Sequence, residues 1–211
     1  RGNVVNPDDV VEKYGADSFR LYEMFMGPLD KSKPWSTKGL QGCYRFTQKI
    51  WKIYTQDMNK ISDEPASKET LRILHQTIKK VTKDLDSLDF NTAVSQMMIF
   101  VNHMLAQGES NSDVLHKFLI ILNPFAPHLS EELNELIFTE KNITIAEKEW
   151  PKFDESLIVS DSITIAVQIN GKTRGTVELD ANANEEDIFK LIMENDKFYK
   201  YLDNSNIIKK I

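Results

Sequence analysis

The sequence lacks the features that mark several large classes of protein. Its 211 residues include one cysteine, Cys43, so no internal disulfide can form, which favours a reducing, cytoplasmic compartment. No uncharged apolar run approaches the roughly 18 residues that a membrane span requires. The first residues, RGNVVNPDDV, contain neither a signal-peptide pattern nor an initiator methionine. We therefore expect a cytoplasmic chain that begins inside a longer protein, with an expression remnant as the alternative.

Motifs for self-contained catalysis are also missing. The sequence contains no GxxxxGK[ST], GxGxxG, GxSxG or HExxH pattern. Its histidines, at 75, 103, 116 and 128, are never four residues apart, and none pairs with the cysteine, which argues against a zinc site. We predict no catalytic residue, no metal and no cofactor in this chain.

The charge is acidic overall but basic in one tract. A formal net charge of −6 disfavours sequence-independent nucleic-acid binding, because phosphates are repelled at long range. Any RNA-binding surface must therefore concentrate its cations locally. Between residues 31 and 55 there is no acid, whereas the cations are Lys31, Lys33, Lys38, Arg45, Lys49 and Lys52.

Helical periodicity dominates the first two thirds of the sequence. Residues 1–36 are expected to form two short helices and a loop, with Asn6 and Asp17 as N-caps. Residues 37–138 are expected to form a bundle of amphipathic helices, beginning near 37, 68, 91, 113 and 127. The first of these helices has an apolar stripe at Cys43, Phe46, Ile50 and Ile53.

The remaining sequence has a different character. Residues 139–161 show no helical period and are interpreted as an irregular linker that allows independent motion. Apolar residues then alternate up to Ile169, and Asn170-Gly171 indicates a tight hairpin. With a helix capped by Asn184 and a possible last strand at 207–211, residues 162–211 are expected to form a small α+β unit. The predicted fold class is thus mainly α, with this unit at the C-terminal end.

Candidate RNA contacts follow the basic tract. Arg45, Lys49 and Lys52 form a second stripe on the helix beginning at Thr37, which is either an ordinary solvated face or a phosphate-contacting one. Trp35, just before this helix, either stacks on RNA or is a hydrophobic anchor. Trp51, at helical spacing, is expected in the core.

The hairpin tip offers a second set of cations. Lys172 and Arg174 lie beside Gly171 and Gly175, and small residues let a backbone approach a target closely. A solubilising turn is the alternative interpretation.

Four stretches together resemble one family. Residues 1–36 resemble the sequence after the KMSKS signature of class I aminoacyl-tRNA synthetases. GCYRFTQKIWKIY at 42–54 and LNPFAPHLSEELNE at 122–135 resemble helices of their anticodon-binding domain, and VQINGKTRGTVEL at 167–179 resembles the C-terminal hairpin of bacterial leucyl-tRNA synthetases. The hairpin selects the leucyl type, and the absence of a cysteine-rich C-terminal module counts against the isoleucyl type.

The resemblance implies a tRNA-docking role without catalysis. The parent enzyme would attach leucine to tRNA(Leu) with ATP and Mg²⁺ through an adenylate, on an upstream catalytic domain of the same chain that carries HIGH and KMSKS. The family's pattern matches the bundle domain to 37–138 and the C-terminal domain to 162–211. It implies tRNA contacts at Trp35, Lys38, Arg45, Lys49, Lys52, Lys172, Arg174, Lys209 and Lys210.

Some alternatives stay open from sequence. The same region of a valyl or methionyl synthetase shares the first three stretches in outline, and a non-enzymatic protein-interaction bundle would also carry amphipathic helices. One departure concerns the end of the chain: family members run about ten residues beyond Ile211, so we expect a truncated C-terminal unit.

Overall fold

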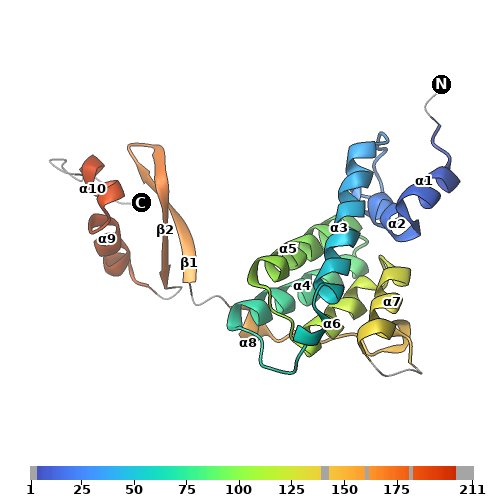
Figure 1. The fold of residues 1–211 in the computed structure, drawn as a ribbon. Coiled ribbons are helices and arrows are strands. Elements are labelled where there is room, and N and C mark those ends of the chain that lie inside the picture. The colour runs from blue at the N-terminus through green and yellow to red at the C-terminus, as the bar shows by residue number, and fades with distance from the viewer. Residues whose placement is uncertain (1–3, 139–142, 160–161, 181–182, 203–211) are drawn as a thin grey trace. The chain divides into compact units, whose positions relative to one another are not determined.

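A computed structural model describes residues 4–138, 143–159, 162–180 and 183–202 (Figure 1). The chain divides into two compact units, a helical unit (Arg1–Ile158) and a C-terminal unit (Val159–Ile211). The helices of the first unit are α1 (Pro7–Tyr14), α2 (Ala16–Phe25), α3 (Thr37–Thr55), α4 (Lys68–Asp86), α5 (Phe90–Gln107), α6 (Ser112–Leu122), α7 (Pro127–Ile137) and α8 (Glu155–Ile158), with short 3-10 turns η1 (Met58–Lys60) and η2 (Ile145–Glu147). The C-terminal unit contains β1 (Ser162–Ile169), β2 (Lys172–Asp180), α9 (Glu185–Met193) and α10 (Asp196–Leu202).

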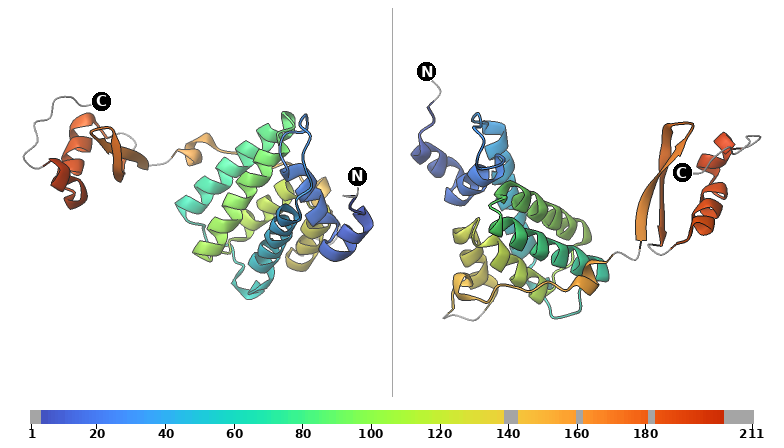
Figure 2. Two further views of the ribbon diagram at one scale, coloured as in Figure 1. Left: turned by 90° about the horizontal axis from the view of Figure 1, so that it is seen from above. Right: turned by 180° about the vertical axis from the view of Figure 1, so that it is seen from behind.

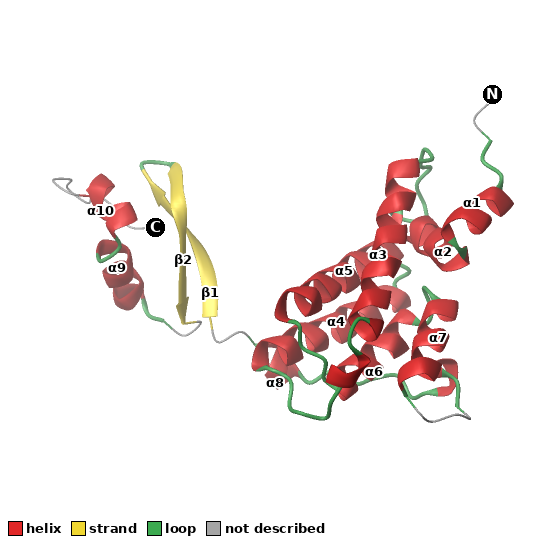
Figure 3. Cartoon of the chain, in the orientation of Figure 1, coloured by secondary structure: helices red, strands yellow, loops and turns green. Residues whose placement is uncertain are grey.

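The helical unit packs its helices around one apolar core, as the two views of Figure 2 show. The predicted stripe on α3 is confirmed at Cys43, Phe46 and Ile50, which are buried, while Ile53 is partly buried. α4 contributes Leu74, Ile78 and Val81, each 0% exposed. Within the described residues, every helix is too short or too polar to cross a lipid bilayer. The predicted fold class, mainly α with a small α+β unit, is confirmed (Figure 3).

A carboxylate is one of several groups that join the segment before the bundle to the bundle. The Asn6 side chain caps α1 as predicted, and Gly15, at φ 83°, ends that helix. Asp17 was expected to cap α2, but Gly15 occupies the N-cap position of α2. The Asp17 carboxylate instead accepts a hydrogen bond from the Leu129 amide at 2.6 Å, in the first turn of α7. Asp17 thus caps a helix that lies 110 residues further along the sequence.

Most of the expected linker at 139–161 is packed rather than free. Its residues 143–158, here called the connecting segment, belong to the helical unit. Ile145 is 1% exposed, and Pro151 is buried. The segment lacks a single helical period because it contacts different helices in turn: η2 contacts α6 and α7, and α8 contacts α4. Only Val159 and residues 160–161 separate it from β1.

The C-terminal unit is a hairpin packed against two helices. Asn170 and Gly171 have φ values of 54° and 73°, as the predicted two-residue turn between paired Ile169 and Lys172 requires. Asn184 caps α9 through its side chain, as predicted. The small core of this unit consists of Val167, Val177, Leu179 and Phe198. The possible last strand at 207–211 lies outside the described residues.

Candidate nucleic-acid interface

The outer face of α3 carries the predicted cations. Lys38, Arg45, Lys49 and Lys52 are all exposed, and they form what we call the cationic face. At 100° per residue, these positions fall within one sector of the helix, opposite the buried residues Cys43 and Ile50. The core therefore fixes the direction in which the cations point. Because the backbone of α3 is continuous over all of them, their spacing along the surface is also fixed.

The cationic face is not neutralised by neighbouring carboxylates. Lys38, Arg45 and Lys52 make no hydrogen bond or ion pair with any residue that the structure describes. Lys49 donates to the neutral side-chain oxygen of Asn102 on α5, at 2.8 Å. Helix α5, which packs on α3, contains no aspartate, glutamate, lysine or arginine. The cations therefore keep their full charge toward solvent, which suits a polyanionic partner.

Trp35 holds the start of α3 in place. Its ring lies 4.9 Å from Tyr22 and 6.3 Å from Phe19, and its Nε1 donates to Thr37 Oγ1 at 3.2 Å. The Tyr22 hydroxyl in turn accepts a hydrogen bond from the Ser36 amide at 2.6 Å. These contacts favour the hydrophobic-anchor interpretation of Trp35 over stacking on a base.

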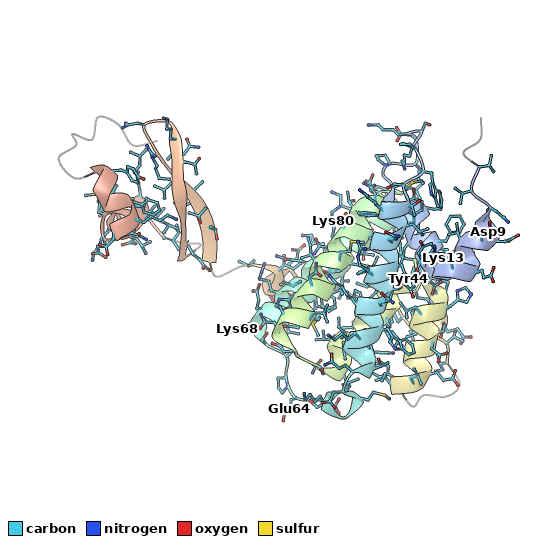
Figure 4. All side chains as sticks on the ribbon, turned by 45° about the horizontal axis from the view of Figure 1, so that its top comes forward. Asp9, Lys13, Tyr44, Glu64, Lys68 and Lys80 are labelled. Atoms are coloured by element: carbon cyan, nitrogen blue, oxygen red, sulfur yellow. The ribbon has the colours of Figure 1, made fainter. Side chains whose placement is uncertain are left out.

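The prediction that Trp51 lies in the core is wrong, since its exposed fraction is 41%. Trp51 follows the buried Ile50, so it is turned about 100° away from the centre of the buried stripe. Tyr44, labelled in Figure 4, shares this side of α3. Its ring packs edge-on against that of Tyr14 on α1, with ring centres 5.6 Å apart. On this side of α3, Tyr44 therefore contacts α1, whereas Trp51 is exposed to solvent.

At the hairpin, the two predicted cations have different environments. Lys172 is exposed next to the turn. Arg174 is the residue that bulges out of the strand pairing, because Val167 pairs with Gly175 and Gln168 pairs with Thr173. The Arg174 guanidinium lies 4.3 Å from the centre of the Tyr201 ring, so a cation–π contact already engages part of its charge.

Gly175 serves internal packing rather than the approach of a ligand. A Cβ at this position would lie 3.0 Å from both the Phe198 ring and Lys197 Nζ. Phe198, on α10, is 0% exposed and contributes to the core of the unit. The interpretation of Gly175 as a small residue facing a target is therefore replaced by a close helix–strand contact. Lys209 and Lys210 lie outside the described residues.

Comparisons with known proteins identify the family. The model for the anticodon-binding domain of tRNA ligase matches residues 67–189, which is more than half of the chain. The chain belongs to this family. It is 46% identical over 207 residues to the leucine–tRNA ligases of Borrelia hermsii (strain HS1 / DAH) and Borreliella burgdorferi (strain ZS7), covering 98% of this chain and 24% of each relative.

A solved structure gives the same result in three dimensions. The LeuRS of Agrobacterium radiobacter K84, crystallised in a ternary complex with tRNA and LeuAMS, is 28% identical with a TM-score of 0.77. That match covers 99% of this chain and 29% of the solved chain. The chain thus spans about a quarter of the length of the curated relatives it matches.

The cations of α3 precede the stretch that the family model matches. Sequence reasoning found those cations and missed Asn102, which holds Lys49 beside α5. A sequence signal for this contact exists. Residues 90–107 contain no aspartate, glutamate, lysine or arginine, whereas the charged residues of 37–55 are all positive.

The histidines and the cysteine have structural surroundings. His103 Nε2 lies 2.8 Å from Thr70 Oγ1, and His128 Nδ1 lies 2.8 Å from the Asp17 carboxylate. Burial raises the pKa of the Cys43 thiol to about 11, so it stays protonated and unreactive near neutral pH. Among the described residues, histidine, cysteine and acidic side chains nowhere gather in a group of three that could hold a metal ion.

Proposed function

We propose that this chain is the tRNA-docking portion of a leucine–tRNA ligase, with the cationic face of α3 as its main RNA contact. The observation that carries the proposal is the set of unpaired cations on one rigid helix, beside an uncharged helix, in a chain with a net charge of −6. The relatives named leucine–tRNA ligase and the tRNA-bound LeuRS structure support the choice of partner, tRNA(Leu).

The residues have different roles in this proposal. The Arg45 guanidinium forks onto two phosphate oxygens, whereas Lys38, Lys49 and Lys52 act as mobile point charges. Lys172 adds a tRNA contact from the hairpin. We also propose tRNA contacts for Arg174, Lys209 and Lys210, because they match basic positions of the family. Trp35 contributes by fixing the first turn of α3.

Bond formation belongs to the rest of the parent protein. Leucine activation with ATP and Mg²⁺ takes place on an upstream catalytic domain of the same chain, and this portion supplies no catalytic residue. The domains that we propose are an N-terminal segment at 1–36 that follows the catalytic domain, an anticodon-binding bundle from residue 37 and a tRNA-binding C-terminal domain from residue 162. A cytoplasmic location follows from the proposed enzyme.

Other members of the class are less well supported. The relatives at 46% identity are leucine–tRNA ligases, which favours the leucyl enzyme over the valyl and methionyl enzymes. A protein-interaction bundle with an acidic partner predicts the same unpaired cations, so binding measurements have to separate it from RNA docking.

Titration of labelled tRNA(Leu) into the chain tests the proposal. Changing Arg45, Lys49 and Lys52 to Glu should abolish binding, because three attractions become three repulsions at the phosphate backbone. The matched control changes Lys68, Lys79 and Lys83 of α4 to Glu, which alters net charge by the same amount. Equal losses in the two variants, or wild-type binding of tRNA no tighter than binding of heparin, would refute docking through α3.

A further inference from the structure

The connecting segment (residues 143–158) is attached to the helical unit at separate points. Near its start, the Glu131 carboxylate on α7 accepts hydrogen bonds from the amides of Ile145 and Ala146, at 2.9 Å and 3.2 Å. At its middle, Trp150 Nε1 donates to Thr82 Oγ1 on α4 at 2.8 Å. These bonds, with the burial of Ile145 and Pro151, make the first half a stable attachment.

The second half of the segment packs on α4 through α8 and through Lys79, which lies over the Phe153 ring, and its one bond to a buried polar side chain is made by an imidazole. The Asp154 amide donates to Nδ1 of His75, a residue of α4 that is 7% exposed, at 2.9 Å. The other polar contacts of this half are weaker. Gln76 Nε2 donates a long hydrogen bond of 3.4 Å to the Ile158 carbonyl. Lys79 forms an ion pair with Glu155 at 2.7 Å, and the side chains of both residues are exposed to solvent.

This hydrogen bond requires a neutral imidazole. Nδ1 can accept only while it carries no proton, so His75 is the tautomer with hydrogen on Nε2. Protonation would place a hydrogen on Nδ1, so that Nδ1 and the Asp154 amide would both be donors and could not bond to each other. Burial lowers the pKa of His75, with a smaller contribution from Lys117, while the carboxylates of Asp154 and Asp113 raise it.

We propose that His75 is a proton-sensitive clasp for residues 154–158, and that losing its bond to Asp154 lengthens the tether between the two units. The Trp150 attachment has no titratable group, so it persists and limits how much of the chain is released. Fully extended, residues 159–161 span at most about 10 Å, whereas residues 152–161 span at most about 35 Å. The clasp would thus set how far the C-terminal unit can reach.

The direction of the pH effect follows from the lowered pKa. When residues 154–158 are released, His75 on α4 regains an ordinary pKa near 6.5, so protons bind the released form of the chain more tightly than the attached form. Attachment is therefore strongest above pH 6.5 and weakens as the pH falls below it. The Asp154 carboxylate stays ionised over this range, because hydrogen bonds from Ser156 lower its pKa.

The test is the protection of the Asp154 amide against hydrogen exchange in the full chain. Between pH 7.5 and pH 5.5, after correction for intrinsic exchange rates, protection should fall by up to about tenfold in the wild type, the limit set by an open-state pKa near 6.5. In His75→Asn, whose Oδ1 takes the place of Nδ1 without titrating, protection should not change with pH. In His75→Leu, which has no acceptor, protection should be low at both pH values.

A second histidine provides the control. In His103→Gln, the amide keeps a polar group where Nε2 of the histidine contacts Thr70. Between pH 7.5 and pH 5.5, this variant should lose as much protection at the Asp154 amide as the wild type does. Trypsin cleavage after Lys152, divided by the cleavage rate of an unstructured peptide at the same pH, gives an independent readout and should rise in parallel with amide exchange. The same fall in protection in His75→Asn as in the wild type, or no fall in the wild type, would overturn the proposal. A His75→Leu chain that fails to fold leaves both of those comparisons intact.

Discussion

Helices α3 and α4 have the same length and the same kind of start but use their cations differently. Each has 19 residues and a serine N-cap, with Ser36 bonded to the Gly39 amide and Ser67 bonded to the Thr70 amide. On α4, three of the five lysines and arginines are paired with carboxylates: Arg72 with Glu69, Lys79 with Glu155 and Lys80 with the buried Asp84. On α3, Lys38, Arg45 and Lys52 have no such partner among the described residues.

The difference predicts that the charges of α4 serve stability, whereas those of α3 are available for binding. Paired cations on α4 satisfy groups of the same protein, as when Lys80 and Thr92 both bond to the Asp84 carboxylate. Unpaired cations on α3 contribute little to folding, because they are solvated before and after the chain folds. The two sets of charges should therefore respond in opposite ways to substitution.

The largest expected effect is in the core, where the two helices are alike. Ile50 of α3 and Ile78 of α4 are both 0% exposed, so either Ile→Ala change should destabilise the helical unit by about 3–4 kcal/mol. Urea denaturation followed by circular dichroism measures this. Losses that differ by more than about 2 kcal/mol between the helices would show that only one of them is integral to the core.

A smaller loss is expected at the buried carboxylate of α4. Asp84 is 2% exposed, and Asp84→Ala removes the carboxylate that Lys80 and Thr92 share, which leaves Lys80 the Thr92 hydroxyl and leaves Thr92 the Asp89 carbonyl. We expect the free energy of unfolding to fall by about 2 kcal/mol. This is less than the usual cost of breaking a buried ion pair, because the Lys80 ammonium can rotate into solvent. Asp86→Ala, an exposed neighbour on the same helix, is the control and should cost under about 0.5 kcal/mol.

The smallest effect on stability is expected on the cationic face itself. Changing Arg45, Lys49 and Lys52 to Gln should alter the free energy of unfolding by less than about 0.5 kcal/mol per site, because only Lys49 loses a contact, the one with Asn102. The same denaturation experiment applies. A loss of several kcal/mol would mean that these cations are structural, like Lys80 on α4.

Local patterns predicted the helices and the hairpin well. Asn6, Asn184 and the pair Asn170-Gly171 act on backbone groups within a few residues, so their effects can be recognised from the sequence. The cationic face was also visible, because its members share one helix whose apolar stripe fixes its orientation.

Contacts between distant segments were not visible from the sequence. The caps that Asp17 and Glu131 supply, and the acceptor that His75 supplies, depend on which elements become neighbours after folding. For the same reason, residues 143–158 were taken for a free linker, and Gly175 for a ligand-facing residue. Trp51 was predicted to be buried but is exposed, because it lies at the edge of the apolar stripe of α3. Helical periodicity does not show whether another helix covers that edge.

The most direct test of unpaired charge on α3 is the salt dependence of tRNA binding. The slope of log affinity against log salt concentration should shrink by about 2–3 when Arg45, Lys49 and Lys52 become Gln, since each phosphate contact contributes about 0.7–0.9. The same change at Lys68, Lys79 and Lys83 of α4 should leave the slope unaltered. Equal slopes for the two triple variants would contradict the account.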